Sequence, residues 1–177
     1  QASTILDLKK LNDHCHRVGI LAKAIAKQEG PPKKACDFSL MAGMMHDIGK
    51  LILATAYPDQ AKEIYHQQEP GSDWQREADT FGISHAQIGA YLLGVWNLPN
   101  PVVEAVAYHH MPEKAIDHPF SPLSATHIAN LLIDEYEINP EEAHNQSIDV
   151  DYVSRFADEH KLKQWRELAS EIFEQAE

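Results

Sequence analysis

Long apolar runs and cysteines are both scarce in this sequence. No apolar run approaches the roughly 18 residues that a membrane span needs, and no basic stretch followed by a short apolar one suggests a signal peptide. The cysteines, Cys15 and Cys36, form no CxxC pattern, so we expect two reduced, packed thiols. These absences favour a cytoplasmic protein without membrane contact.

Basic residues are also few, with 15 Lys and Arg against 27 Asp and Glu and a formal net charge of −12. Because such a surface repels phosphate backbones, we do not expect nucleic-acid backbone binding. A nucleotide or other phosphate-containing small molecule could bind locally, through metal ions or a few positive groups. The length of 177 residues suits a single domain, 1–177, and the start at Gln1 rather than Met is consistent with a fragment of a longer protein.

The alternation typical of strands is missing, whereas helical spacing recurs along the chain. A first helix is predicted over 4–28, because its apolar residues fall on one stripe: Leu11, Val18, Leu21 and Ile25. The next helix, from about Asp37, is evenly apolar, which indicates a central, buried element that Gly49 loosens or breaks.

Further helices are predicted from their start and stop signals. Ser84 with Gln87 three residues later is a capping signature, and Pro101 suits the first position of a helix. The predicted helices are 58–68, 74–81, 84–96, 100–110 and 121–136, with two or three more up to 177. The chain is therefore expected to be all-α, an irregular multi-helix bundle.

Histidine is the residue that stands out, with eleven in the chain. His14 lies on the apolar stripe of the first helix, so its ring should point inward. His16 lies two residues on, about 200° round the helix, and should face water. A single inward histidine is usually a core residue, so His14 alone does not establish a metal site.

His46 and Asp47 follow one another in the apolar run MMHDIGKL. An ionised carboxylate among methionines and isoleucines is costly unless it is paired or bound to a metal. Neighbouring side chains project about 100° apart on a helix, which suits an imidazole on one ion and a carboxylate that bridges to a second. A buried His–Asp hydrogen bond is the alternative, and the pattern alone does not separate the two.

Three more histidines lie near helix ends. His85 falls in the first turn after the Ser84 cap, and His109 and His110 close a later helix. The last two could lean into one pocket, or could favour the negative end of the helix dipole. Taken together, five inward-leaning histidines and one buried aspartate on four helices are hard to explain by packing alone.

Imidazole and carboxylate ligands suit iron, manganese, zinc or nickel, and the lack of cysteine ligands argues against a purely structural zinc site. We therefore expect one or two divalent transition-metal ions as the cofactor. A bridged pair would activate a water and clamp a phosphoryl group. Lys50 could meet a phosphate as a point charge, or it could be a solvated lysine at a helix end.

These motifs resemble the HD superfamily of metal-dependent phosphohydrolases, whose name comes from the His–Asp pair in HDIGKL. The run HCHRVGILAKAIA matches the upstream histidine of that superfamily. The stretch FGISHAQIGAYLLGVWNLPNPVVEAVAYHH resembles more specifically the HDOD branch, a signalling output domain often attached to bacterial receiver domains. The related HD-GYP branch hydrolyses cyclic di-GMP. The resemblance covers about 10–136, which leaves 140–177 as a C-terminal helical extension.

The resemblance implies two groups of metal ligands that share one aspartate. One metal would be held by His14, His46 and Asp47, and the second by Asp47 with His85, His109 and His110. Lys50 would face a phosphate. Asp47 and Lys50 are the residues expected to act in catalysis.

The chain departs from the HD pattern in two places. The last ligand of the superfamily is an aspartate, and the matching position in SATHIANLLID holds Asn130. Asn130 can coordinate weakly through its carbonyl, while Asp134, one turn on, could substitute or be a surface charge. Second, MPEKAIDHPF follows His110 without a glycine-tyrosine-proline element, which removes the main support for cyclic di-GMP hydrolysis. Four further histidines match no ligand position and are expected to be ordinary: His118, His127, His144 and His160.

Two functions therefore stand as hypotheses. The first is a bacterial signal-transduction output domain of HDOD type that retains an HD-type metal site and acts through a signalling protein partner or an attached receiver or sensor domain. The alternative is an active metal-dependent phosphohydrolase on a nucleotide or other phosphate ester. The departures favour the first hypothesis, and the near-complete ligand set favours the second.

Overall fold

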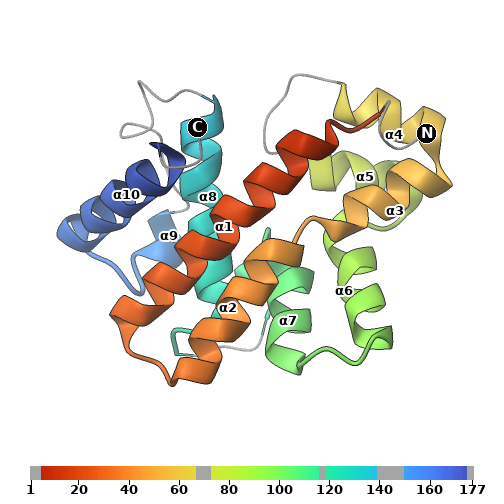
Figure 1. Cartoon of the computed structure of the whole chain (residues 1–177). Helices are drawn as coiled ribbons and strands as arrows, with labels where there is room; N and C mark the ends of the chain where they lie inside the picture. Colours follow the sequence, from red (N-terminus) through yellow and green to blue (C-terminus); the bar gives the residue numbers. More distant parts are fainter. Residues whose placement is uncertain (1–4, 67–72, 116–118, 139–149, 175–177) are drawn as a thin grey trace.

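The computed structural model of the chain describes residues 5–66, 73–115, 119–138 and 150–174. These residues form an irregular bundle of helices and include no strand, as the sequence predicted (Figure 1). Within the same ranges, no helix combines the length and the apolar character that a membrane crossing requires. The elements are α1 (Leu8–Glu29), α2 (Lys33–Met45), α3 (Ile48–Ala56), α4 (Pro58–Tyr65), α5 (Asp73–Phe81), α6 (His85–Val95), α7 (Asn100–Tyr108), the 3₁₀ helix η2 (Pro112–Lys114), α8 (Pro122–Ile138), α9 (Val150–Val153) and α10 (Glu159–Glu174).

Capping residues set the ends of α1 and the start of α6. The Asp7 side chain accepts the first free backbone N–H groups of α1, and Gly30 ends that helix with a φ of 73°, a left-handed conformation that glycine adopts at little cost. Ser84 and Gln87 form the predicted capping box of α6. Helix α1 begins later than predicted, at residue 8 rather than 4, because the cap is Asp7.

For the second helix, the predictions of where it begins and where it breaks were both wrong. Helix α2 begins at Lys33, before Asp37, and the chain turns at His46 and Asp47 rather than at Gly49. Gly49 lies inside α3, where a Cβ would overlap the backbone carbonyl of His85. A glycine is therefore required for α3 to contact the start of α6, and the His–Asp pair sits at a helix junction.

The burial predicted for the second helix also needs correction. Its buried residues are small ones, Cys36, Ser39, Ala42 and Gly43, whereas Met44 is 47% exposed. Small residues allow close approach of α1, and a Cβ on Gly43 would meet the backbone of Gly19. The helix is central because its backbone packs tightly, although its large apolar side chains are only partly covered.

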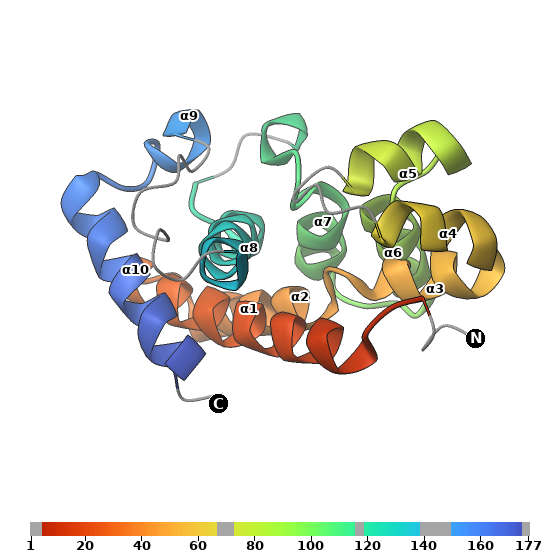
Figure 2. The same ribbon diagram turned by 90° about the horizontal axis from the view of Figure 1, so that it is seen from above.

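Two main apolar cores fill the bundle. Buried residues of α1, α8, α9 and α10, with Cys36 of α2, form the first core, and residues of α2, α6, α7 and α8 form the second. Viewed from above, α8 is seen end-on between these two parts, while α3 to α6 lie at the end opposite α10 (Figure 2). Trp165 of α10 is fully buried in the first core and donates to Gln28 Oε1 at 3.1 Å. This face of α10 therefore packs against the bundle.

Candidate metal centre

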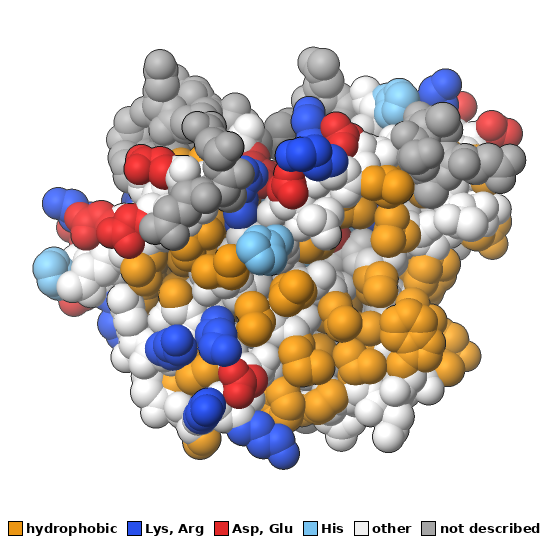
Figure 3. Space-filling model, in the orientation of Figure 1, with side chains coloured by type: hydrophobic (Ala, Val, Ile, Leu, Met, Phe, Trp, Pro, Cys, Tyr) orange, Lys and Arg blue, Asp and Glu red, His pale blue; other side chains and the backbone are white. Residues whose placement is uncertain are grey.

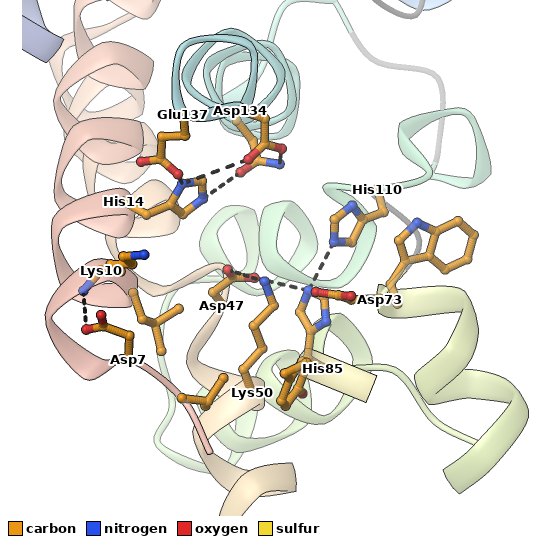
Figure 4. A pocket seen from close by; sticks show the side chains of 15 residues that line it. Asp7, Lys10, His14, Asp47, Lys50, Asp73, His85, His110, Asp134 and Glu137 are labelled. Atoms are coloured by element: carbon orange, nitrogen blue, oxygen red, sulfur yellow. Dashed lines mark hydrogen bonds and ion pairs between the residues drawn. The ribbon is translucent and has the colours of Figure 1, made fainter. Parts of the chain in front are cut away.

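The side chains of the predicted ligand set meet in one buried cluster, of which Figure 4 shows His14, Asp47, His85 and His110. They come from α1, the junction between α2 and α3, the start of α6, the end of α7, and α8. All are buried except His110, which is partly exposed at the edge of the cluster: His14, His46, Asp47, His85, His109, His110 and Asn130. Segments far apart in the sequence thus bring together the residues that the pattern singled out.

The first group gathers around His14. Its Nε2 lies 3.2 Å from His46 Nε2 and 3.0 Å from Asn130 Oδ1. Asp47 Oδ2 lies 3.6 Å from His46 Nε2, and one ligand atom from each of His14, His46 and Asp47 falls within 4.8 Å of the others. This spacing fits three or four ligands around one ion.

The second group gathers around His85. Its Nε2 lies 3.1 Å from Asp47 Oδ1 and 3.0 Å from His110 Nε2. His109 completes the group, in which the four ligand atoms again lie within 4.8 Å of one another. Asp47 therefore offers one oxygen to each group, which is the orientation of a bridging carboxylate.

The outer ring nitrogens of four histidines face oxygen acceptors. His14 Nδ1 lies 3.0 Å from Glu137 Oε2, and His85 Nδ1 lies 2.7 Å from Glu77 Oε2. His46 Nδ1 lies 2.7 Å from the carbonyl oxygen of Gly43, and His109 Nδ1 lies 2.8 Å from that of Val106. Since these oxygens accept, the hydrogen-bond network assigns a proton to each Nδ1. When such a ring is neutral, the lone pair of its Nε2 points into the cluster, as in metal-ligating histidines.

Several inward atoms lack a partner that donates to them. His109 Nε2 is buried without a hydrogen bond, and so is Asp47 Oδ1. Asn130 Nδ2 donates to Asp134 Oδ2 at 3.2 Å, which turns the amide oxygen of Asn130 toward His14. Converging lone pairs repel one another unless a cation or a proton lies between them. The donor set thus fits a divalent transition-metal ion, and the cluster could hold one without identifying which.

The histidines of the cluster differ in the direction in which their surroundings shift the pKa. Burial lowers the pKa of His46 to about 4 and holds the pKa of His109 and His110 well below its usual value. Burial acts in the same direction on His14, but nearby carboxylates, Glu137 first, raise its pKa to about 9. A proton on His14 therefore takes the place of positive charge in the first group when no metal ion is bound.

Lys50 lies against Asp47 rather than standing free. Its Nζ donates to Asp47 Oδ2 at 2.7 Å. Burial alone would lower the pKa of Lys50, but the charge of Asp47 raises it above its usual value. Lys50 also lines the cavity beside the cluster, so it is placed between the ligands and any molecule that enters.

A cavity of about 350 Å³ opens beside the cluster. With the histidines of the lining counted as neutral, five carboxylates and two lysines give a formal excess of three negative charges: Asp7, Asp47, Asp73, Asp134, Glu137, Lys10 and Lys50. Trp74 lines the cavity as well, and its ring stacks on His110 with 5.8 Å between centroids. Without bound cations, this cavity would repel an anion.

Asp134 does not take the place of Asn130. Its Oδ1 lies 3.9 Å from His14 Nδ1, on the outer side of the ring, and its side chain is 42% exposed. By accepting from Asn130 Nδ2, Asp134 orients the amide that occupies the ligand position. With His14 and Glu137, Asp134 also forms a third group whose ligand atoms lie within 4.8 Å of one another.

Two supporting carboxylates were not predicted from the sequence. Glu77 of α5 is fully buried and Glu137 of α8 accepts from His14, but neither belongs to a motif, and only tertiary contacts reveal them. His127 was expected to be ordinary, yet it is buried and its Nδ1 donates to the carbonyl oxygen of His109 at 2.7 Å. His16 and His160 are exposed, as expected, and the remaining predictions, on His118 and His144, lie outside the described residues.

Comparison with known proteins identifies the family. The family model of the HDOD domain matches residues 1–112, more than half of the chain. An uncharacterized protein from Treponema pallidum (strain Nichols) is 30% identical over 133 residues. That match covers 74% of this chain and 26% of the relative, so the chain spans about a quarter of the length of the larger protein.

Three solved structures share the fold. A candidate phosphohydrolase from Shewanella amazonensis SB2B matches with a TM-score of 0.71 and 19% identity, covering 97% of this chain and 62% of that one. A candidate signal transduction protein from Marinobacter aquaeolei VT8 gives 0.65 and 22%, covering 94% and 37%. A response regulator from Methylococcus capsulatus strain Bath gives 0.55 and 18%, covering 92% and 62%. Because the family model matches the segment that supplies every clustered histidine and Asp47, the chain belongs to the HDOD domain family.

Proposed function

We propose that this chain is a signal-transduction domain of HDOD type that binds a divalent transition-metal ion and acts by contacting a protein partner. The observation that carries the proposal is the acidic cavity in which Lys50 is already paired with Asp47. A phosphate group needs an excess of positive charge around it. Here one of the two lysines neutralises a ligand, and four further carboxylates line the same space.

Metal binding is supported by the converging Nε2 atoms and by the unpaired His109 Nε2. The second group has three histidines and the Asp47 carboxylate, whereas the first group has two histidines, the same shared carboxylate and the neutral amide of Asn130. Because an imidazole suits a transition-metal ion better than an amide oxygen does, we expect the second group to fill first. Iron, manganese, zinc and nickel all suit these donors.

A surface for a partner is available on α6 and the residue that follows it. Tyr91, Val95 and Trp96 are 73%, 64% and 56% exposed, and Figure 3 shows apolar side chains gathered over the part of the molecule where α6 and α7 lie. No Lys, Arg, Asp or Glu occurs from 80 to 103. Such a patch suits an apolar protein surface rather than a charged one.

The length of the structural neighbours supports the proposal that a further domain is attached to this chain. Two structural neighbours are described as a candidate signal transduction protein and a response regulator, and this chain covers 37% and 62% of them. We therefore propose that the chain is one domain, with the C-terminal helices as its extension, which operates beside a receiver or sensor domain in a longer signalling protein.

Hydrolysis of a phosphate ester is the second candidate function, and the near-complete ligand set favours it. Two dications would change the formal charge of the cavity from three negative to one positive, and a cavity of about 350 Å³ is large enough for a small phosphate ester. Bound ions would then supply an activated water, with Asp47 holding them and Lys50 contacting the phosphate. A structural neighbour described as a candidate phosphohydrolase is consistent with this function.

An assay separates the two functions. The chain and its Asp47→Ala and His16→Ala variants are incubated with p-nitrophenyl phosphate and bis-p-nitrophenyl phosphate under Mn²⁺, Fe²⁺, Ni²⁺ or Zn²⁺. We expect no cleavage above the metal-only background in any sample. Cleavage that Asp47→Ala abolishes and exposed His16→Ala retains would contradict the signalling proposal and establish the hydrolase.

A further inference from the structure

Glu77 is a fully buried carboxylate at the edge of the metal cluster. Its Oε2 accepts from the backbone N–H of His85 at 2.6 Å and from Nδ1 of the same residue at 2.7 Å. Its Oε1 accepts from the Tyr65 hydroxyl at 2.8 Å. Three donors from α4 and α6 thus hold one carboxylate of α5 in a fixed orientation.

No lysine or arginine of the described residues pairs with Glu77. Neighbouring Arg76 contacts Asp73 Oδ1 and the carbonyl of Ile64, whereas Glu77 contacts His85 and Tyr65. A buried carboxylate without a cation is costly, even when it is hydrogen-bonded. On the far side of the His85 ring, Nε2 meets Asp47 and His110, so positive charge placed there would offset the Glu77 charge through the ring.

The geometry joins Glu77 to the second group through one ring. The carboxylate fixes the His85 tautomer with the proton on Nδ1, so that the Nε2 lone pair faces Asp47, His109 and His110. An anionic acceptor also makes the ring a stronger electron-pair donor than a neutral carbonyl acceptor does. His46 and His109, by contrast, donate to the backbone carbonyls of Gly43 and Val106.

On the basis of the proposed metal binding, we propose that Glu77 is a positioning residue whose negative charge strengthens His85 as a ligand and makes the second group the tighter of the two. It also ties α5 to the metal site. Helix α5 packs on α4 and α6, and it carries Asp73 and Trp74 to the cavity wall. Metal bound at His85 would therefore help to hold α5 in place.

Glu137 is the corresponding carboxylate of the first group, and it provides a matched control. Its Oε2 accepts from His14 Nδ1 at 3.0 Å, but its side chain is 30% exposed and Arg17 lies 3.4 Å from its other oxygen. Solvent and the guanidinium both weaken the influence of this charge on the ring. Removal of the Glu137 charge is expected to affect the first group, and less strongly.

Glu77→Gln tests the charge while keeping the shape. The amide oxygen of the substituted side chain can accept from both His85 donors, and its NH₂ can donate to Tyr65 if that hydroxyl rotates to accept. Metal binding is followed by titration with Co²⁺, using the visible absorption of the ion and the quenching of Trp74 fluorescence. Trp74→Phe identifies the quenching component, since Trp74 stacks on His110.

We expect Glu77→Gln to weaken the Co²⁺ affinity of the second group by about 10- to 100-fold, with far-UV circular dichroism unchanged. Glu137→Gln should leave the quenching of Trp74 nearly unchanged. If Glu77→Gln is unstable, Tyr65→Phe removes only one hydrogen bond to Glu77 and should weaken the same group by about 2- to 10-fold.

The Co²⁺ titrations separate a failure of the proposed metal binding from a failure of the Glu77 role. Wild-type protein that binds no Co²⁺ would overturn the proposed metal binding and this inference with it. Wild-type protein that binds Co²⁺ while Glu77→Gln binds it equally well would overturn only the role of the Glu77 charge, because a merely structural role survives the isosteric change. Equal weakening by Glu77→Gln and Glu137→Gln would also contradict a role specific to the second group.

Discussion

At the scale of single residues, Asp47 is the side chain that both ligand groups share. One of its oxygens lies 3.1 Å from His85 Nε2, and the other lies 2.7 Å from Lys50 and 3.6 Å from His46 Nε2. The residue is 2% exposed, so its charge is compensated by these neighbours instead of by water. One carboxylate thus links both ligand groups to the cavity.

Asn130→Asp should strengthen the first ligand group. The amide oxygen of Asn130 lies 3.0 Å from His14 Nε2, and a carboxylate there would add a negative charge to a set that has only the shared Asp47. We expect the affinity of the first group for Mn²⁺ or Zn²⁺ to rise by about tenfold or more, since affinity follows ligand charge. Competitive titration against a chromogenic chelator measures the change.

Asn130→Ala is the control for that change, and it should lower the affinity of the first group. Equal metal affinity in the wild type, Asn130→Asp and Asn130→Ala would show that position 130 does not act as a ligand. The second group, which does not include this residue, should be unaffected in all three proteins.

Two helix junctions position the ligands at the scale of elements. The turn between α2 and α3 releases His46 and Asp47 from a regular helix, and α3 then contacts the start of α6 at Gly49. The Ser84–Gln87 capping box fixes where α6 begins. Because His85 is the first residue of α6, the same contact that needs a glycine at position 49 also sets the position of His85.

Gly49→Ala should therefore disturb both stability and the metal site. Its Cβ would overlap the His85 carbonyl, and overpacking of this kind costs about 1–3 kcal/mol in the free energy of unfolding. Urea denaturation measures the loss, and metal content is expected to fall as His85 moves.

Gly94→Ala in α6 is the matched control, because a Cβ there meets nothing within 4 Å. Replacing this helical glycine should stabilise the protein by about 0.5–1 kcal/mol. A Gly49→Ala variant as stable as Gly94→Ala, with its metal intact, would contradict the close contact between α3 and α6.

Local patterns predicted these elements better than they predicted what surrounds the ligands. The inward stripe of α1 placed His14, and the capping signature placed His85, because both depend on residues a few positions apart. The turn at His46 was not predicted, since it depends on how α3 meets α6. Glu77 and Glu137 lie 8 and 123 residues from the histidines they contact, and only the packing of distinct helices brings them there.

At the scale of the whole molecule, the candidate metal cluster draws its ligands from helices of both main cores. Ligands from α1 and α8 belong to the side that carries α10, and those from α6 and the end of α7 belong to the other. An ion that joins these elements would bind the folded chain and not the unfolded one. Metal binding is therefore expected to stabilise the whole fold.

The predicted size of this effect follows from mass action. With free metal at about 100 times its dissociation constant, stability should rise by about 2.7 kcal/mol, which corresponds to about 5–10 °C in Tm for a chain of this length. Differential scanning calorimetry of metal-loaded and chelator-treated protein measures the shift. Asp47→Ala should give no shift, and an equal shift in that variant would place the stabilising ion elsewhere.

The metal content of the purified chain measures directly whether the buried His/Asp cluster holds an ion. Protein prepared without chelator or a metal-affinity tag is analysed for iron, manganese, zinc and nickel, beside Asp47→Ala prepared in the same way. We expect about one equivalent of transition metal per chain, held by the second group, and its loss in Asp47→Ala. A wild-type chain without metal, even after soaking in each ion, would contradict this expectation.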